Sequence, residues 1–306
     1  MVRKNLIYIF LIFSLNSFAQ RDSVTIHSTH TRKWIVGGGS AATYGSSFIL
    51  LNKAWYKDYP RSSFHTYNDA GEWMQMDKVG HAWSVYNISR ATTALWKWTG
   101  VKDKTAILLG TGGSLLYMLS IEYLDGRSAE WGWSWADVGS NLAGGILFAS
   151  QELKWKEQVV QLKFSSHRNN YEPSLRPRAN ELFGKTLPER LLKDYNAQTY
   201  WLSFNLRSLL KSNLPRWVNI SFGYGGEGLF GGYENLAYDK NGNIVFDRRD
   251  IKRHRQWYLS PDIDFTKIET GSKFLRSVLF ALNAVKFPAP SLELSNGKLK
   301  ANWFQF

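Results

Sequence analysis

Acidic and imidazole side chains occur at helical spacing in the first half of this sequence, and they are the residues that could do chemistry. Asp77 and His81 lie four residues apart, so both side chains fall on one face of a helix. A carboxylate beside an imidazole can hold a divalent cation or orient a general base. An acid at a helix start also suits the helix dipole, so a purely structural pair is the alternative.

Further polar residues stand near the ends of two later helical segments. One segment ends at Glu122 and Asp125, and the next begins with Ser134-Trp135-Ala136-Asp137, which resembles a capping box with Asp in place of Glu or Gln. Antiparallel neighbouring helices would bring these ends to the start of the helix that carries Asp77. The predicted polar cluster therefore comprises Asp77, Lys78, His81, Glu122, Asp125, Ser134, Asp137 and Asn141.

Such a cluster has three interpretations. Buried polar groups in a helical core must pair with one another, so a structural network is the leading one. Binding of a ligand or a divalent metal is the second, and catalysis is the third, with Asp77, His81 and Asp137 as ligands and Glu122 as base. No nucleophile elbow or phosphate-binding loop is present, so the sequence identifies no reaction and no cofactor.

Long, weakly charged segments around these residues predict about four helices. They comprise Trp34–Asn52, Val79–Trp98, Thr105–Ile121 and Trp135–Leu153. Three of these segments contain clusters of glycine, which would let helix backbones approach closely. Because Gly, Ser and Thr dilute the apolar residues of Trp34–Asn52 and Thr105–Ile121, neither is a convincing membrane-spanning segment, although membrane association is expected.

The second half of the chain has a different pattern. Residues 156–199 are charged and contain Pro, which predicts a linker or surface segment. Alternation over Trp217–Tyr224 and Trp257–Phe265 predicts strands, Asn241-Gly242 and Asn296-Gly297 predict turns, and Lys273–Lys286 predicts a helix. We therefore expect a mainly α fold, in which a glycine-rich bundle of about four helices over residues 20–155 precedes a smaller C-terminal α+β part over residues 200–306.

The start of the chain has the features of a secretion signal over residues 1–19. Arg3 and Lys4 precede an apolar run, and Ser17-Phe18-Ala19 offers small residues for cleavage. Cleavage after Ala19 would remove two positive charges and lower the formal charge from +13 to +11. An exported basic protein is expected to meet a membrane or an anionic envelope surface rather than nucleic acid.

One group of motifs resembles a known family. Asp77-Lys78-x-x-His81, Glu122-x-x-Asp125-x-x-Ser128 and Gly132-Trp133-Ser134-Trp135-x-Asp137 resemble the YfiM-like predicted periplasmic lipoproteins, a domain of unknown function, over roughly residues 70–155. A fainter similarity reaches the VanZ-like membrane proteins and implies a VanZ-like helical arrangement and an envelope role. The chain contains no Cys, so the family's lipid anchor is not carried over.

These observations predict an exported, periplasmic and membrane-associated envelope protein whose polar cluster is structural or binds a ligand. The first alternative is a metal-assisted hydrolase or transferase that acts on lipid or cell-wall precursors. The second is an outer-membrane barrel-like protein, because the strands alternate and the chain ends in Phe306. The five or so strands expected are too few for a complete barrel of at least about eight strands.

Overall fold

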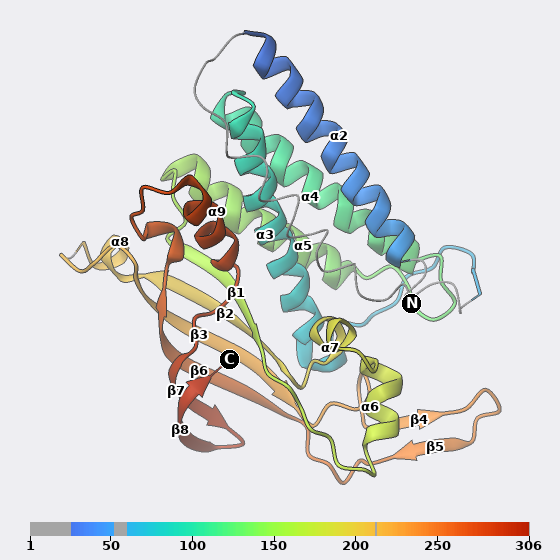
Figure 1. Ribbon diagram of the computed structural model, residues 1–306. Helices are drawn as coiled ribbons and strands as arrows, with labels where there is room; N and C mark the ends of the chain where they lie inside the picture. Colours follow the sequence, from blue (N-terminus) through green and yellow to red (C-terminus); the bar gives the residue numbers. More distant parts are fainter. Residues whose placement is uncertain (1–25, 52–59, 212, 306) are drawn as a thin grey trace.

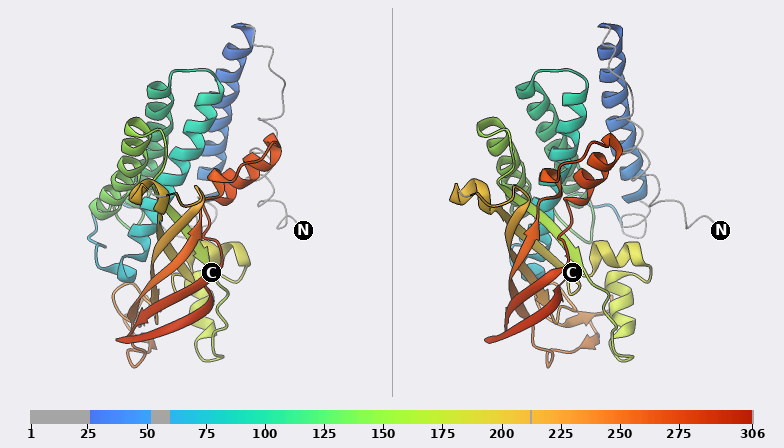
Figure 2. Two further views of the ribbon diagram at one scale, coloured as in Figure 1. Left: turned by 90° about the vertical axis from the view of Figure 1, so that its left-hand side faces the viewer. Right: turned by 60° about the vertical axis from the view of Figure 1, so that its left-hand side comes forward.

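The computed structural model describes residues 26–51, 60–211 and 213–305. The predicted secretion signal, residues 1–19, and the terminal Phe306 lie outside the described residues. Long helices gather at one end of the molecule and the main sheet lies at the other (Figure 1). Two further views show the same division (Figure 2).

Within the described residues, four long helices make up the helical end, each where the sequence predicts one. They are α2 (Ile26–Leu51), α3 (Met76–Trp98), α4 (Asp103–Asp125) and α5 (Trp135–Lys154). Helix α3 packs against both α4 and α5, and Tyr86 of α3 meets Phe148 of α5 in a buried apolar cluster. Helix α2 is joined to this layer by a hydrogen bond from Ser47 to the Tyr117 hydroxyl and by stacking of Tyr44 on Tyr117.

Two glycines set the spacing of these helices. A Cβ atom on Gly144 of α5 would lie 2.1 Å from the carbonyl oxygen of Ala82 in α3. A Cβ atom on Gly110 of α4 would lie 2.6 Å from the backbone nitrogen of Thr93 in α3. Both positions therefore require glycine. Gly112 and Gly113, by contrast, have no neighbouring atom within 4 Å of such a Cβ, so only part of the glycine pattern reflects close packing.

The sheet is much larger than the sequence suggested, and the predicted mainly α fold is wrong. The described chain is 47% helical and 23% strand. Six antiparallel strands form the main sheet in the order β1-β2-β3-β6-β7-β8, and β4 and β5 form a separate hairpin. The strands are β1 (Val160–Ser166), β2 (Gln198–Asn205), β3 (Val218–Glu227), β4 (Leu236–Tyr238), β5 (Ile244–Asp247), β6 (His254–Ile263), β7 (Ala289–Ser295) and β8 (Lys298–Gln305).

Shorter helices connect the strands. They are the 3-10 helix η2 (Glu72–Gln75), α6 (Arg176–Phe183), α7 (Leu187–Lys193), α8 (Leu206–Leu210), η3 (Phe265–Lys267) and α9 (Lys273–Leu282). The segment 156–199, which the sequence predicts to be a linker or surface segment, contains β1, α6 and α7. Both predicted Asn-Gly turns are present, at residues 241–242 between β4 and β5 and at 296–297 between β7 and β8.

The main sheet buries a polar face and exposes an apolar one. In β3, Asn219 and Ser221 are buried on one face of the sheet. Phe222, which follows Ser221 and lies on the opposite face, is 53% exposed. The register places Leu202, Phe222, Leu259 and Leu292 side by side across four strands. Helix α3 covers part of this apolar face over β1, β2 and β3, where Trp83 packs against Phe164 and Tyr200, and Met76 lies in a cluster that includes Tyr224. Elsewhere on this face Phe222, Trp257 and Leu292 are exposed.

The sheet is curled around its polar face. The chain that leads into β7 first pairs with β1, through the bridge between Val285 and Phe164. In a flat sheet, β1 and β7 would lie four strand spacings apart, or about 19 Å. Only three residues lie between Val285 and Ala289, the first residue of β7, and the four residue-to-residue steps span about 14 Å at most. The sheet must therefore bend enough to bring the two strands together.

Charged side chains fill the inside of this curl. Lys163 of β1 lies 3.0 Å from the Asp262 carboxylate, and Lys286 lies 3.8 Å from the other oxygen of that carboxylate. Ser203 also donates a hydrogen bond to Asp262, and Lys286 donates to the carbonyl oxygens of Pro261 and Phe287. These partners satisfy the buried charges, so the polar interior is a stable arrangement.

Candidate functional site

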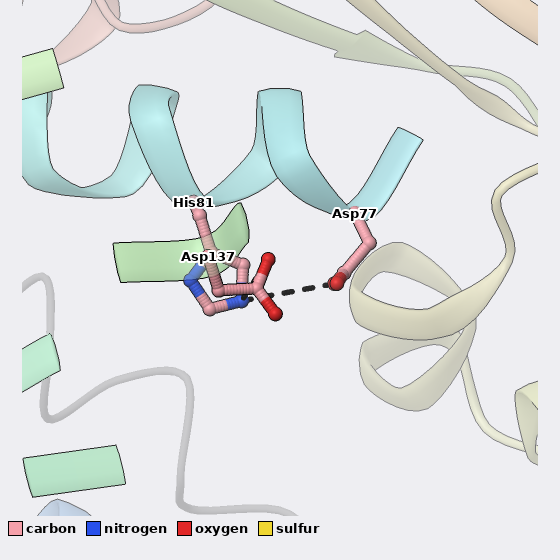
Figure 3. Close-up of side chains that lie close together, drawn as sticks. All are labelled: Asp77, His81 and Asp137. Atoms are coloured by element: carbon pink, nitrogen blue, oxygen red, sulfur yellow. Dashed lines mark ion pairs between the residues drawn. The ribbon is translucent and has the colours of Figure 1, made fainter. Parts of the chain in front are cut away.

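Residues from three helices and from the loop before them meet at one end of the helical layer. Asp77, Lys78 and His81 come from the first turns of α3, and Asp137 and Asn141 come from the first turns of α5. Glu122 comes from the last turn of α4, where its side chain is 1% exposed. Figure 3 shows the carboxylates of Asp77 and Asp137 near the same end of the His81 ring, the end that carries Nε2. The structure therefore brings these side chains together.

Lys78 is at the centre of the charged groups. Its ammonium lies 2.9 Å from Asp137 Oδ1 and 3.0 Å from Asp77 Oδ2, and it also pairs with Asp69. The lysine side chain is only 8% exposed. Burial alone would lower the pKa of Lys78, but the Asp77 and Asp137 carboxylates outweigh it and raise that pKa above its usual value. Lys78 is therefore charged at every physiological pH.

Asp69 and Tyr195 complete the cluster, and the sequence alone predicts neither of them. Asp69 lies in the loop before η2, and it accepts a hydrogen bond from Ser134 as well as pairing with Lys78. Tyr195 follows α7 and donates a hydrogen bond of 2.8 Å to Asp77 Oδ1. Neither residue has a helical spacing that relates it to Asp77. Asp69 lies nine residues before Lys78, so a search of the preceding loop for acids that could pair with this lysine would have suggested it. No local sequence pattern indicates Tyr195.

The backbone before α3 is held in an unusual conformation that places Asp69 beside Lys78. Trp73, Met74 and Gln75 have φ angles of 48°, 53° and 65°, in the left-handed region that non-glycine residues avoid. The sheet end of the molecule stabilises this turn, because Tyr224 of β3 donates a hydrogen bond to the Met74 carbonyl oxygen and Arg255 of β6 donates one to the Gln75 side chain. The position of Asp69 thus depends on the sheet.

Ser134 begins α5 and links its first turn to the cluster. Its hydroxyl accepts a hydrogen bond of 3.0 Å from the Asp137 backbone N–H, which is a normal N-cap, and donates to Asp69. The start of α5 is therefore fixed by a side chain that also contacts the Lys78 partner. Asp125 is half-buried in the last turn of α4, and its charge raises the pKa of Glu122.

His81 lies between the acidic groups. Its Nδ1 is 3.2 Å from Asn141 Oδ1 and 3.3 Å from Glu122 Oε1, and its Nε2 is 3.8 Å from both Asp77 Oδ1 and Asp137 Oδ1. Burial would lower the pKa of His81, but the carboxylates of Asp77, Asp137 and Glu122 raise it above the usual value. The imidazolium form is therefore favoured in the folded protein.

Two of the acids hold their protons more tightly than exposed acids do. Burial raises the pKa of Glu122 to about 8, against the opposing effect of His81. Burial also raises the pKa of Asp137 to about 7, with His81 and Lys78 opposing it and the charge of Asp77 adding to it. The pKa of Asp77 is lowered instead, because His81 and Lys78 outweigh its burial. Glu122 and Asp137 therefore bind protons near neutral pH, where exposed acids are ionised.

Asp77, His81 and Asp137 could together hold a metal ion. One potential ligand atom from each lies within 4.8 Å of the others, and carboxylate oxygen with imidazole nitrogen suits Mn²⁺ or Zn²⁺. Glu122 Oε1, Asp137 Oδ1 and Asn141 Nδ2 are also buried without a partner at hydrogen-bond geometry. Against this, the Lys78 ammonium already lies within 3.0 Å of both carboxylates that such an ion would use. The donor set fits a metal only if Lys78 moves.

Residues 66–150 match a family model described as a predicted periplasmic lipoprotein family, a domain of unknown function. The matched stretch contains the whole cluster except Tyr195. It supports the expected export and periplasmic location, although the chain has no Cys. No curated protein and no solved structure gives a significant match to the chain. The similarity to VanZ-like membrane proteins stays a prediction.

The raised pKa values of Glu122, Asp137 and His81 predict a stability that decreases from pH 5 to pH 8. A group whose pKa is higher in the folded state binds more protons there than in the unfolded state. The free energy of unfolding therefore falls as the pH rises from the pKa of the unfolded state to the pKa of the folded state. Replacing Glu122→Gln removes one of these groups and should make the thermal unfolding midpoint less dependent on pH. Thermal unfolding at pH 5, 6, 7 and 8 measures this.

The control for this experiment is Glu269→Gln, which removes an exposed acid far along the chain and should leave the pH dependence unchanged. If the unfolding midpoint depends on pH equally in the wild type and in Glu122→Gln, the raised pKa of Glu122 is contradicted.

Proposed function

We propose that this protein is a non-enzymatic envelope protein that associates with a membrane through apolar outer surfaces, and that the Lys78 cluster holds these surfaces in place. The observation that carries the proposal is the inverted sheet, which buries charged groups such as Asp262 and exposes Phe222 and Trp257. A sheet in water does the opposite, because apolar side chains are stabilised by leaving water. The inverted pattern fits a surface that faces lipid.

The long helices expose apolar side chains as well. Leu108 and Leu116 of α4 are 70% and 68% exposed, and Ile146 of α5 is 64% exposed. Soluble monomers seldom expose wide continuous apolar patches. Helix α4 is also long and apolar enough to cross a membrane by length and composition, and it is the one such helix in the described residues. One helix of this kind is weak support by itself, but the exposed sheet face points in the same direction.

Aromatic residues stand at both ends of the exposed side of α5. Trp135 is 69% exposed at its first residue, and Trp155 is 51% exposed just after its last. Trp side chains are enriched where the apolar and polar parts of a membrane meet. Lys154 lies over the Trp155 ring at 5.2 Å and adds a positive charge at that end, which suits anionic headgroups.

The outer sheet face also carries an apolar groove of about 500 Å³ between β3, β6, β7 and β8. Its walls include Ile220, Leu259, Leu292 and Trp303. In strand β8, which forms one side of the groove, Trp303 is 82% exposed and Phe304 is 73% exposed. An acyl chain suits a groove of this shape and composition. Six strands in the main sheet are fewer than the eight of the smallest membrane barrels, so we propose lipid contact by one face rather than a complete barrel.

The lipid contact predicts a specific effect of polar substitutions. The triple variant Leu108→Gln, Leu116→Gln and Ile146→Gln should release at least about half of the protein from liposomes in a flotation assay, because each change removes about 2 kcal/mol of apolar burial in lipid. A control triple variant carries Tyr238→Gln, Ile244→Gln and Val245→Gln on the β4–β5 hairpin, where the side chains are equally exposed.

The control variant should float like the wild type. Circular dichroism in a mild detergent checks that both variants are folded. A wild-type protein that remains at the bottom of the gradient, or equal release of both triple variants, would contradict the proposal.

The metal-assisted hydrolase or transferase is the second candidate, because Asp77, His81 and Asp137 lie close enough to share an ion. The Lys78 ammonium takes the place of that ion, so we expect purified protein to contain less than about 0.1 equivalents of metal and its unfolding temperature to be unaffected by Zn²⁺, Mn²⁺ or Mg²⁺. Elemental analysis and thermal unfolding measure this. A stoichiometric metal that is lost in Asp137→Asn would instead support the enzyme.

A further inference from the structure

A second polar region lies outside the Lys78 cluster and has no part in the proposed function. It is a cavity of about 520 Å³ between the end of β1, helix α6 and helix α7, which we name the basic cavity. Figure 1 shows α6 and α7 next to each other. Asp194 lines the cavity, and the next residue, Tyr195, donates its hydroxyl to Asp77, so the cavity and the cluster are neighbours along the chain.

Positive charge dominates the lining of the basic cavity. Four cationic side chains line it, namely Arg168, Arg176, Lys185 and Arg190, and Asp194 is its one acid. Asp194 is already used, because it pairs with Arg190 at 3.1 Å and accepts a hydrogen bond from Tyr171. Glu189 is close along the chain, but its carboxylate accepts the backbone N–H groups of Lys185 and Thr186 instead.

Three of the four cations have no carboxylate partner within the described residues. Arg176 donates only to the Tyr171 carbonyl oxygen, at 3.4 Å, and no ion pair or side-chain hydrogen bond involves Arg168 or Lys185 in that part of the chain. Like charges around one hollow repel one another unless an anion joins them. The cavity therefore has an excess of about three positive charges with no counter-charge from the protein.

Arg190 is held rigidly at the inner wall. Its guanidinium donates to Asp194 Oδ2 at 3.1 Å and to Asn180 Oδ1 at 2.8 Å. It also lies over the rings of Tyr171 and Phe183, at 5.1 and 5.9 Å. A preorganised guanidinium loses little entropy when it binds an oxyanion. The cavity thus combines one fixed arginine with three exposed cations.

We propose that the basic cavity binds the phosphate group of a ligand. Arginine and lysine together suit a phosphate, because guanidinium groups bind its oxygens in pairs and an ammonium adds a point charge. The volume of about 520 Å³ leaves room for a group attached to the phosphate. Leu187 and Leu191, which are 64% and 38% exposed, line one side and suit an apolar attachment.

The phosphate could come from an anionic lipid headgroup or from a soluble phosphate, and the experiment separates these sources. The full-length protein in a non-ionic detergent is titrated by calorimetry with inorganic phosphate, glycerol 3-phosphate and dihexanoyl phosphatidic acid, at one ionic strength set by NaCl. Binding of at least one probe supports the phosphate site. Phosphatidic acid binding about tenfold more tightly than glycerol 3-phosphate identifies a lipid headgroup, and equal affinities identify a soluble phosphate.

The variants test whether the binding occurs in the cavity. Arg168→Gln with Lys185→Gln removes two exposed cations that make no contacts needed for folding, and it should weaken binding about tenfold or more. The matched control, Arg216→Gln with Lys240→Gln, removes the same charge from exposed positions elsewhere and should leave the affinity within about twofold.

Two results would overturn the proposal. One is a wild-type protein that binds none of the three probes. The other is an equal loss of affinity in both double variants, since that would reflect general surface charge rather than the cavity. The inference does not depend on lipid contact by the apolar surfaces, because inorganic phosphate and glycerol 3-phosphate test it without a membrane.

Discussion

The ammonium of Lys78 is the group on which the rest of this structure depends. It joins three carboxylates that belong to different parts of the chain, namely Asp69 in the loop before α3, Asp77 in α3 and Asp137 in α5. Removing one partner of a buried charge typically costs about 3–5 kcal/mol, because the other partners remain buried without compensation. The lysine therefore fixes how α3, α5 and the preceding loop are arranged.

The same cluster ties the helices to the sheet. Asp77 accepts a hydrogen bond from Tyr195, which stands just before β2, and the left-handed turn before α3 is held by Tyr224 of β3 and Arg255 of β6. Helix α3 then covers part of the apolar sheet face over β1, β2 and β3 and leaves residues such as Phe222 and Trp257 exposed. The extent of the exposed apolar surface is therefore a consequence of where the cluster holds α3.

The sequence predicts some of this arrangement and not the rest, for physical reasons. The long helices were predictable because each is a long run with few charged residues, and the spacing of Asp77 and His81 already puts both on one face. Alternation in β3 shows which residues share a face, but it does not show which face is buried. Because charged residues such as Lys163 lie in β1, that strand resembled part of a surface segment, and the size of the sheet was missed. Asp69 and Tyr195 were missed because tertiary folding brings Asp69 to Lys78 and Tyr195 to Asp77.

The central claim is that Lys78 acts as a structural cation between carboxylates, and a double-mutant cycle with Lys78→Met and Asp137→Asn tests it most directly. Urea unfolding at pH 7 gives the free energy of unfolding for the wild type, both single variants and the double variant. If the pair is coupled as described, the double variant loses less stability than the two single losses together, by about 2 kcal/mol or more. Additive losses, with a coupling near zero, would contradict the account.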